Sequence, residues 1–447
     1  MTLLIGARRM IRSYRHLGAL LALALIIRVM LTPFSAYWGK DGTDEIFWKD
    51  WMLAIHQHGL LNIFRSTNTD YVGYQYVLWL LSLINDAIGG VYGNEALGLH
   101  LLVKVPPVLF DLGLIIAVYA VSRSLFEELR LQQAGALALG AAAVIALQPA
   151  VLYDSAVWSQ TDSAITLAML LALFFVVRGR TKLGFGIWAA GFLIKPHPII
   201  ILPLLLYLAW RQSPRVLKQG LATVAVVWLV GLGPWLLHGD AGNLLRVYSN
   251  LFNADDGGLT ASAWNLWWLF DQTLHPQPDQ AAFGFVTYRM LGFLLSASAC
   301  FLALFYLHAR PNLRGALVAA AYLAFAFYLL PVSTHERYLY PFLVFMLPAA
   351  VVDKRWRLLY IAASATFFLN LVVVAPPVYD LFPARWVGSP FTMTVAALNC
   401  ALFALFTLAV LPVAFPSMRA LLQRSSRGAR GMASTPGSIG PAEASRR

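Results

Sequence analysis

Residues 315–352 read GALVAAAYLAFAFYLLPVSTHERYLYPFLVFMLPAAVV, and this stretch decides the fold class. Two apolar runs, 315–331 and 338–352, enclose a short segment with a histidine, an acid and an arginine in succession. A membrane-spanning helix needs about 20 predominantly apolar residues, and ionisable side chains at membrane depth are costly enough to need a reason. The stretch therefore predicts two membrane helices that are joined by a polar segment of functional interest.

The whole chain has the same apolar character. Of its 447 residues, 59% are hydrophobic and 12% are charged, whereas a soluble domain carries roughly 25% charged residues. A mean hydropathy of +0.67 cannot be hidden in one water-soluble core, so the soluble classes are excluded. Cys300 and Cys400 lie in apolar runs, and neither a disulfide framework nor a cysteine metal cluster is expected.

Apolar runs elsewhere predict an all-α, polytopic membrane protein with about twelve transmembrane helices. The candidate spans are 17–36, 97–122, 133–152, 162–178, 219–237, 285–307, 315–331, 338–352, 357–375 and 391–415. Two shorter runs, 183–195 and 198–209, flank Lys195-Pro196-His197-Pro198 and are expected to form a hairpin of short helices. Residues 72–90 are amphipathic and are expected to lie along the membrane surface.

The predicted organisation has three parts. A basic N-terminus, 1–16, precedes a polytopic transmembrane domain, 17–415, whose first outer loop, 37–96, carries the surface helices. The Ser, Gly, Ala, Pro and Arg-rich tail, 416–447, is expected to be disordered.

The net charge of +12 is interpreted as a signal of orientation, so no nucleic-acid partner is expected. Four arginines precede the first apolar run with no acid among them, and the positive-inside rule places this end in the cytoplasm. If the apolar runs then cross the membrane one after another, the tail and the other basic loops lie inside, and most acids lie outside. These loops hold Arg123/Arg130, Arg178/Arg180/Lys182, Arg211/Arg215/Lys218, Arg310/Arg314 and Lys354/Arg355/Arg357. We therefore expect a multi-pass protein of the cell membrane, with the bilayer as a partner and both termini in the cytoplasm.

The first outer loop is acidic, and helical spacing is evident from Glu45 to Gly59. Asp44 directly precedes this helix, which makes an N-cap role the plainer interpretation. The alternative is catalytic, because Asp44 belongs to a cluster of outer carboxylates that includes Asp41 and Asp70.

A second outer segment, 238–284, holds Asp255-Asp256-Gly257-Gly258, which could be a solvated turn or bind a cation. Trp264, Trp267 and Trp268 could form an interfacial belt or the wall of a lipid or sugar groove.

The polar segment around Arg337 also has two interpretations. Glu336 and Arg337 could neutralise each other at a helix end, or Arg337 could offer its planar fork to a phosphate, with His335 as a proton donor. Within the apolar runs, Lys104 and Asp111 are a candidate buried pair. Arg337, Lys195 and His197 could converge on one anion at the outer side.

The motifs occur in a specific order: D-x-x-x-W, D-Y-x-x-Y, K-x-P-x-x-x-x-D, W-x-Q-x-D, K-P-x-P, N-x-W and H-E-R-Y-L. This order resembles that of polytopic glycosyltransferases of the GT-C fold, and is similar to bacterial membrane proteins related to the second mannosyltransferase of GPI-anchor synthesis. The matching residues are Asp44 and Trp48; Asp70, Tyr71 and Tyr74; Lys104, Pro106 and Asp111; Trp158, Gln160 and Asp162; Lys195, Pro196 and Pro198; Asn265 and Trp267; and His335 through Leu339. The sequence departs from the family where D-Y-P-P is common, because Val72-Gly73 follows Tyr71 here.

The resemblance implies an enzyme that takes a hexose such as mannose from a polyprenyl-phosphate donor. It implies transfer to a lipid or glycan acceptor on the extracytoplasmic side, with inversion. Asp44 matches the first-loop acid that acts as the base, with Asp41 or Asp70 as second choices. The residues implied for substrate binding are Lys195, His197, His335, Glu336, Arg337, Tyr338, Gln160, Asp162, Asn265 and Trp267.

Such a donor carries its own leaving group, so no nucleotide-binding motif and no organic cofactor are expected. Whether the reaction needs a divalent cation is left open. The alternatives are a transporter or flippase of a lipid-linked or anionic substrate, and another lipid-linked glycan transferase such as a ligase or polymerase.

Overall fold

The computed structural model describes residues 2–37, 43–69, 71–253, 258–378, 381 and 389–433. The helices of the first half are α1 (Thr2–Leu31), α2 (Glu45–His58), α3 (Ile63–Ser66), α4 (Tyr74–Ala87), α5 (Leu97–Glu128), α6 (Ala134–Ala146), α7 (Pro149–Leu152), α8 (Asp162–Val177), α9 (Thr181–Ile194) and α10 (Leu202–Gln212). Those of the second half are α11 (Pro214–Leu237), α12 (Ala241–Asn253), α13 (Trp268–Leu274), α14 (Tyr288–Ala309), α15 (Leu313–Leu329), α16 (Tyr340–Val352), α17 (Lys354–Val374) and α18 (Pro390–Ala433).

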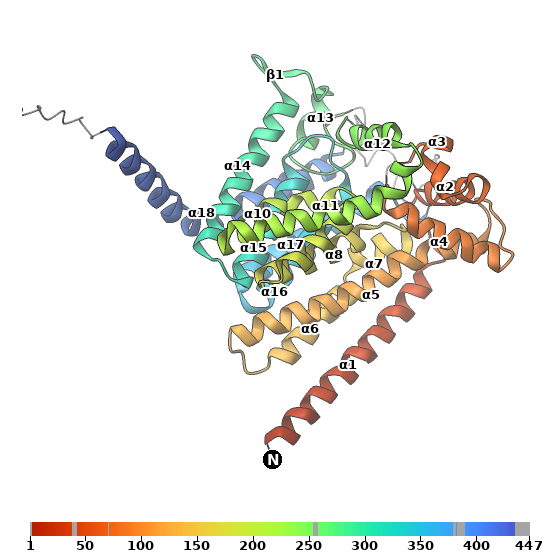
Figure 1. The fold of residues 1–447 in the computed structure, drawn as a ribbon, viewed down its shortest axis with the longest axis horizontal. Coiled ribbons are helices and arrows are strands. Elements are labelled where there is room, and N and C mark those ends of the chain that lie inside the picture. Colours follow the sequence, from red (N-terminus) through yellow and green to blue (C-terminus); the bar gives the residue numbers. More distant parts are fainter. Residues whose placement is uncertain are drawn as a thin grey trace, which may run out of the picture.

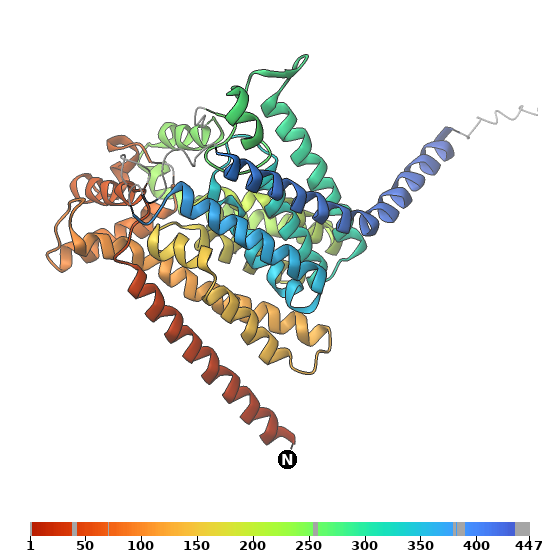
Figure 2. The ribbon, with the colours of Figure 1, turned by 180° about the vertical axis from the view of Figure 1, so that it is seen from behind.

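The predicted all-α class is confirmed. Within the described ranges the only strands are β1 (Ala281–Phe283) and β2 (Val286–Thr287), which pair antiparallel as one short hairpin before α14. The helices run back and forth between two ends of the molecule (Figure 1). From behind, α17 and α18 cover the bundle, and α1 lies along one side of it (Figure 2).

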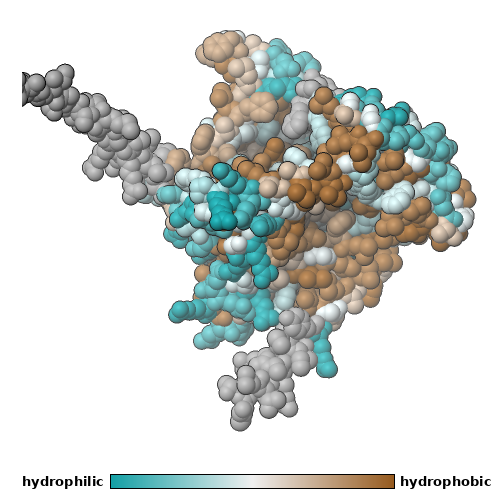
Figure 3. Space-filling model, in the orientation of Figure 1, coloured by the Kyte–Doolittle hydropathy of each residue, from teal (hydrophilic) through white to brown (hydrophobic). Residues whose placement is uncertain are grey.

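The basic loops gather at one end, which we call the basic end. Arg178 contacts Glu128 across the α5–α6 and α8–α9 connections, and Arg314 Nη2 lies 3.0 Å from Asp353 Oδ2 across the next pair of loops. The first-loop helices α2 to α4 and α12 lie at the other end, which we call the site end (Figure 1). The space-filling view shows a mostly apolar band between hydrophilic ends (Figure 3). This distribution is typical of a membrane protein.

The prediction of about twelve spans is wrong. By length and composition, five helices of the described chain could cross a membrane: α5, α11, α14, α17 and Pro390–Pro416 of α18. A sixth candidate is α6 with Pro149–Val157, which is bent by 50°. The remaining apolar runs form shorter helices. α8, for example, has 16 residues, which gives a length of about 24 Å against a hydrocarbon core of about 30 Å.

Prolines explain where several apolar runs break. The predicted span 133–152 bends where Pro149 begins a new helix after α6, because the residue before a proline is driven out of the helical region. Lys195 precedes Pro196 and is extended for the same reason, with φ −157° and ψ 138°. The expected hairpin of short helices is thereby present as α9 and α10 around Lys195.

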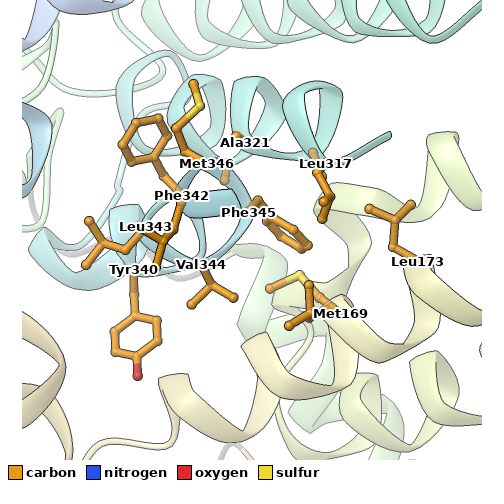
Figure 4. Close-up of a cluster of buried hydrophobic side chains, with 14 of the residues drawn as sticks. Met169, Leu173, Leu317, Ala321, Tyr340, Phe342, Leu343, Val344, Phe345 and Met346 are labelled. Carbon is orange, nitrogen blue, oxygen red and sulfur yellow. The ribbon is translucent and has the colours of Figure 1, made fainter. Parts of the chain in front are cut away.

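The core lies where α8, α15 and α16 meet. α16 buries every side chain from Tyr340 to Ala350. In Figure 4, Phe345 projects between Leu317 of α15 and Met169 of α8. Helix α15 is rich in alanine, and small side chains let neighbouring helices approach closely in a membrane bundle. This core gives the polar segment before α16 a rigid support.

Helix α18 continues to Ala433, beyond residue 416 where the tail was expected to lose regular structure. Residues 434–447 lie outside the described residues. Helix α4 lies where the surface helix was expected, within residues 72–90.

Candidate functional site

Four segments that are distant in the sequence meet at the site end. They are the start of α2, the turn 158–162 between the π turn Tyr153–Val157 and α8, the α9–α10 apex at Lys195, and the segment 333–339 before α16. Each of them carries one of the motifs found in the sequence.

Asp44 occupies the N-cap position of α2, but its side chain makes no cap hydrogen bond. Its Oδ2 instead accepts hydrogen bonds from Trp158 Nε1 at 3.0 Å and Gln160 Nε2 at 2.6 Å. Arg337 Nη1 lies 4.0 Å from the same oxygen. The Asp44 side chain is 18% exposed, so a carboxylate with a fixed orientation remains accessible. Asp44 therefore stands at the N-cap position, as expected, but its side chain does not cap α2.

A second contact ties α2 to the same turn. Trp48, one helical turn after Asp44, donates from Nε1 to the carbonyl of Ser159 at 3.1 Å. Ser159 adopts a positive φ of 64°, which is unusual outside glycine and is held by its surroundings. The D-x-x-x-W and W-x-Q-x-D motifs therefore bind each other through two indole N–H groups.

Of the three residues predicted to converge on one anion, Lys195 and Arg337 converge on a carboxylate of the protein, and His197 does not contact it. Lys195 Nζ lies 3.3 Å from both oxygens of Asp162, and Arg337 Nε lies 4.0 Å from Asp162 Oδ2. Arg337 Nη1 also donates to Glu336 Oε1 at 2.7 Å. The Glu336–Arg337 pair is thus part of a larger cluster with Asp44 and Asp162.

Aromatic rings enclose Lys195. Its Nζ lies 5.9 Å from the ring centroid of Tyr71 and 5.8 Å from that of Tyr338. The His197 ring packs edge-on against Tyr338, with centroids 4.2 Å apart, and its two ring nitrogens are buried without a hydrogen-bond partner. His335 lies 3.9 Å from Glu336 through Nδ1, and its side chain is 26% exposed.

Asn265 and Trp267 lie behind the site rather than at its surface. Asn265 donates to Thr334 Oγ1 at 2.5 Å, and Trp267 donates to the carbonyl of Leu330 at 2.7 Å. Both side chains are buried, so they hold the segment that leads to Arg337. Trp264 and Trp268 are also buried, against α17 and α18 through Asn370 and Thr392. These tryptophans form neither an interfacial belt nor a groove wall.

The predicted Lys104–Asp111 pair is wrong. Asp111 accepts from Arg28 Nε at 2.7 Å and from Ser155 at 2.6 Å, whereas Lys104 Nζ lies 3.1 Å from Glu45 Oε1. Sequence reasoning missed Arg28 and Glu45. An arginine inside the first apolar run was a usable signal, because such a charge needs a buried partner.

Sequence reasoning also missed Asp154, a fully buried carboxyl whose two oxygens have no hydrogen-bond partner. Asp41, Asp70, Asp255 and Asp256 lie outside the described residues. In the part of the chain that is described, no group of three or more His, Cys, Asp or Glu side chains could hold a metal ion.

Comparison with known proteins adds no assignment: no family model matches the chain, and no curated protein matches it in sequence.

Proposed function

We propose that the protein is an integral-membrane glycosyltransferase. It transfers a hexose such as mannose from a polyprenyl-phosphate donor to a lipid or glycan acceptor on the extracytoplasmic side, with inversion and with Asp44 as the base. The observation that carries this proposal is the position of Asp44. Its partly exposed carboxylate is fixed by Trp158 and Gln160 and lies 4.0 Å from the Arg337 guanidinium.

Asp44 has the properties that a general base needs. As a carboxylate it can accept a proton from an acceptor hydroxyl within hydrogen-bond reach. The two donors on its Oδ2 hold the side chain in one orientation, and no cap bond draws it into α2. A fixed carboxylate converts binding of the acceptor into a near-attack geometry.

Arg337 and Lys195 supply the positive charge that the donor phosphate requires. Arg337 offers a fork that suits phosphate oxygens, whereas Lys195 acts as a point charge. Both face Asp162, so a bound phosphodiester would share these cations with that carboxylate. His335 is the more exposed neighbour and could donate to a phosphate oxygen.

The chemical step is a single displacement. The acceptor oxygen attacks the anomeric carbon and gives its proton to Asp44, while the bond from that carbon to the phosphate oxygen breaks. The polyprenyl phosphate leaves with the bonding electrons, and Arg337 and Lys195 stabilise its charge. One displacement inverts the anomeric centre, and no metal is assigned to any step.

The distribution of buried polar groups favours transfer over transport. A transporter needs polar groups along a path from one end to the other. Beyond Asp111 toward the basic end, the buried side chains of α5 are apolar apart from Tyr119 and Ser122. The polar cluster therefore ends about halfway along this helix, which is better suited to chemistry at one face.

An Asp44→Asn substitution tests the proposal. Purified protein in lipid vesicles is given radiolabelled polyprenyl-phosphate hexoses and a lipid extract as acceptor. We expect the wild type to transfer label, and Asp44→Asn to lower kcat by about 10²- to 10⁴-fold, because general base catalysis is removed. Asp86→Asn is the matched control, since Asp86 contacts His56 and Tyr92 in the same loop rather than the site.

Thermal unfolding of each variant shows whether the fold is retained. Near-normal turnover by folded Asp44→Asn would eliminate Asp44 as the base. Absence of transfer by the wild type, together with movement of an intact donor across the vesicle membrane, would favour a flippase instead.

A further inference from the structure

A second buried ionic cluster lies directly behind Asp44, and the proposed mechanism does not use it. Glu45, the residue after Asp44, turns its carboxylate away from the site. Its Oε1 accepts from Ser35 Oγ at 3.0 Å and faces Lys104 Nζ at 3.1 Å, and its Oε2 lies 2.7 Å from His100 Nδ1. His100 and Lys104 are four residues apart on α5 and therefore face the same way.

Lys104 uses all three of its donors within the protein. Besides Glu45, its ammonium group donates to the carbonyl of Phe34 and, at 3.0 Å, to the carbonyl of Val157. Its side chain is fully buried. A lysine has three N–H donors, so Lys104 has none left for a substrate phosphate.

Two of the three partners of Lys104 are sequence neighbours of residues of the site. Glu45 follows Asp44, and Val157 precedes Trp158. The Trp158–Asp44 hydrogen bond therefore joins two segments that Lys104 holds from behind, and a shift in either segment changes that bond.

We propose that Lys104 and Glu45 are positioning residues, which hold the start of α2 against the turn 158–162 so that the Asp44 carboxylate faces the acceptor. This inference rests on the proposed function and gives a role to the Lys104 of the K-x-P-x-x-x-x-D motif. The two side chains would touch neither donor nor acceptor.

We call the contact of Lys104 with Glu45 the clamp. The lowered pKa of Glu45 agrees with this role. Burial alone would raise the pKa of Glu45, but the hydrogen bond from His100 and the charge of Lys104 outweigh burial, and the pKa lies below the ordinary 4.5. His100 Nε2 lies 2.8 Å from the carbonyl of Thr32 and must donate, because a carbonyl only accepts.

The test compares Lys104→Met, Glu45→Gln and the double variant Glu45→Gln/Lys104→Met. We expect Lys104→Met to lower kcat by about 10- to 100-fold, because a small displacement of a catalytic group has that cost. The KM for the donor should stay near the wild-type value, since Lys104 has no donor N–H free for it. Hydrogen exchange in the peptide 43–52 should become faster in the same variant.

The double variant separates positioning from stability. Lys104→Met leaves Glu45 as a buried charge with one partner fewer, which is strongly destabilising, whereas the double variant removes both charges. We expect the double variant to regain thermal stability but not kcat. Arg65→Met is the matched control: it breaks the 2.5 Å Arg65–Asp240 bridge, which anchors the same loop at α3 and also leaves a buried acid. Its kcat should remain at the wild-type value.

The outcomes distinguish this inference from the proposed function. If the wild type transfers no sugar, the proposed function fails, and faster exchange in Lys104→Met still supports the clamp. If Lys104→Met, or the double variant where the single one does not fold, has wild-type kcat and wild-type exchange, the clamp is refuted. A raised donor KM with unchanged kcat would assign Lys104 to donor binding and would equally refute it.

Discussion

Gly73 stands at the second position after Asp70-Tyr71, where the family that we propose often has a proline, and the contacts of Gly73 would not permit one. The backbone N–H of Gly73 donates to the carbonyl of Leu193 at 2.7 Å, a bond that a proline could not make. A Cβ at this position would lie 2.7 Å from the carbonyl carbon of Leu193 and 2.9 Å from the nitrogen of Ile194. The first loop thus touches the backbone immediately before Lys195.

Adding one methyl group at Gly73 should therefore disturb both segments. We expect Gly73→Ala to lower the free energy of unfolding by about 1–3 kcal/mol, because the clash is with backbone atoms that cannot move aside. Thermal unfolding in detergent measures this. Gly98→Ala is the control, because a Cβ at Gly98 has no atom within 4 Å and alanine favours a helix. Equal melting temperatures for the two variants would show that the contact is looser than described.

The sequence indicated most of the site residues but not their partners. The sequence singles out the site residues because charged and amide groups are conspicuous near apolar runs. They are Asp44, Gln160, Asp162, Lys195 and Arg337. Pairing could not be derived, since it depends on how helices far apart in the sequence pack. For this reason Lys104 was paired with Asp111 on its own helix, whereas packing gives it Glu45 of α2.

At the scale of elements, the apolar runs predict where helices lie better than they predict which helices are long enough to cross a membrane. Hydropathy finds the run 162–178, and the helix in it matches that run closely, from Asp162 to Val177, but its 16 residues are too few for a full span. Composition does not reveal where an irregular turn shortens a helix. The segment before α8 contains the π turn Tyr153–Val157 and then the positive-φ Ser159. Both are contacted by other elements, Val157 by Lys104 and Ser159 by Trp48.

The docking of α2 should depend on pH through Glu45. A carboxyl whose pKa is lower in the folded protein stabilises the fold fully above its unfolded pKa, and this contribution is lost as pH falls through the folded pKa. The ordinary value for Glu45 is 4.5, and the folded value lies below it, chiefly because His100 and Lys104 outweigh the effect of burial. The contribution of Glu45 should therefore be complete at neutral pH and decline below about pH 4.5.

Glu45→Gln isolates this contribution, because the other acids titrate in both proteins. We expect the difference in unfolding free energy between wild type and Glu45→Gln to be constant from neutral pH to about pH 5 and to shrink below that. Thermal unfolding of both proteins across this range gives the difference. A difference that grew toward low pH would mean that the Glu45 pKa is raised, and that the cluster does not stabilise the carboxylate.

At the scale of the whole molecule, charge is separated between the two ends. The basic end joins loops through pairs such as Arg178–Glu128 and Arg314–Asp353, whereas the proposed catalytic cluster lies at the site end with α2. Because five helices are long and apolar enough to cross a membrane, the two ends should lie on opposite sides of it. The positive-inside rule then predicts that the basic end lies in the cytoplasm.

Cysteine labelling in intact cells tests this orientation. Cys300 and Cys400 are first replaced by alanine, and single cysteines are introduced at Glu95, which is exposed at the site end, or at Arg180, which is exposed at the basic end. A membrane-impermeant maleimide should label Glu95→Cys from outside and Arg180→Cys only after lysis. The cysteine-free protein should stay unlabelled in both conditions. The reverse pattern would place Asp44 in the cytoplasm, where an extracytoplasmic donor could not reach it, whereas labelling of both sites from outside would mean that the connecting helices do not separate the two ends.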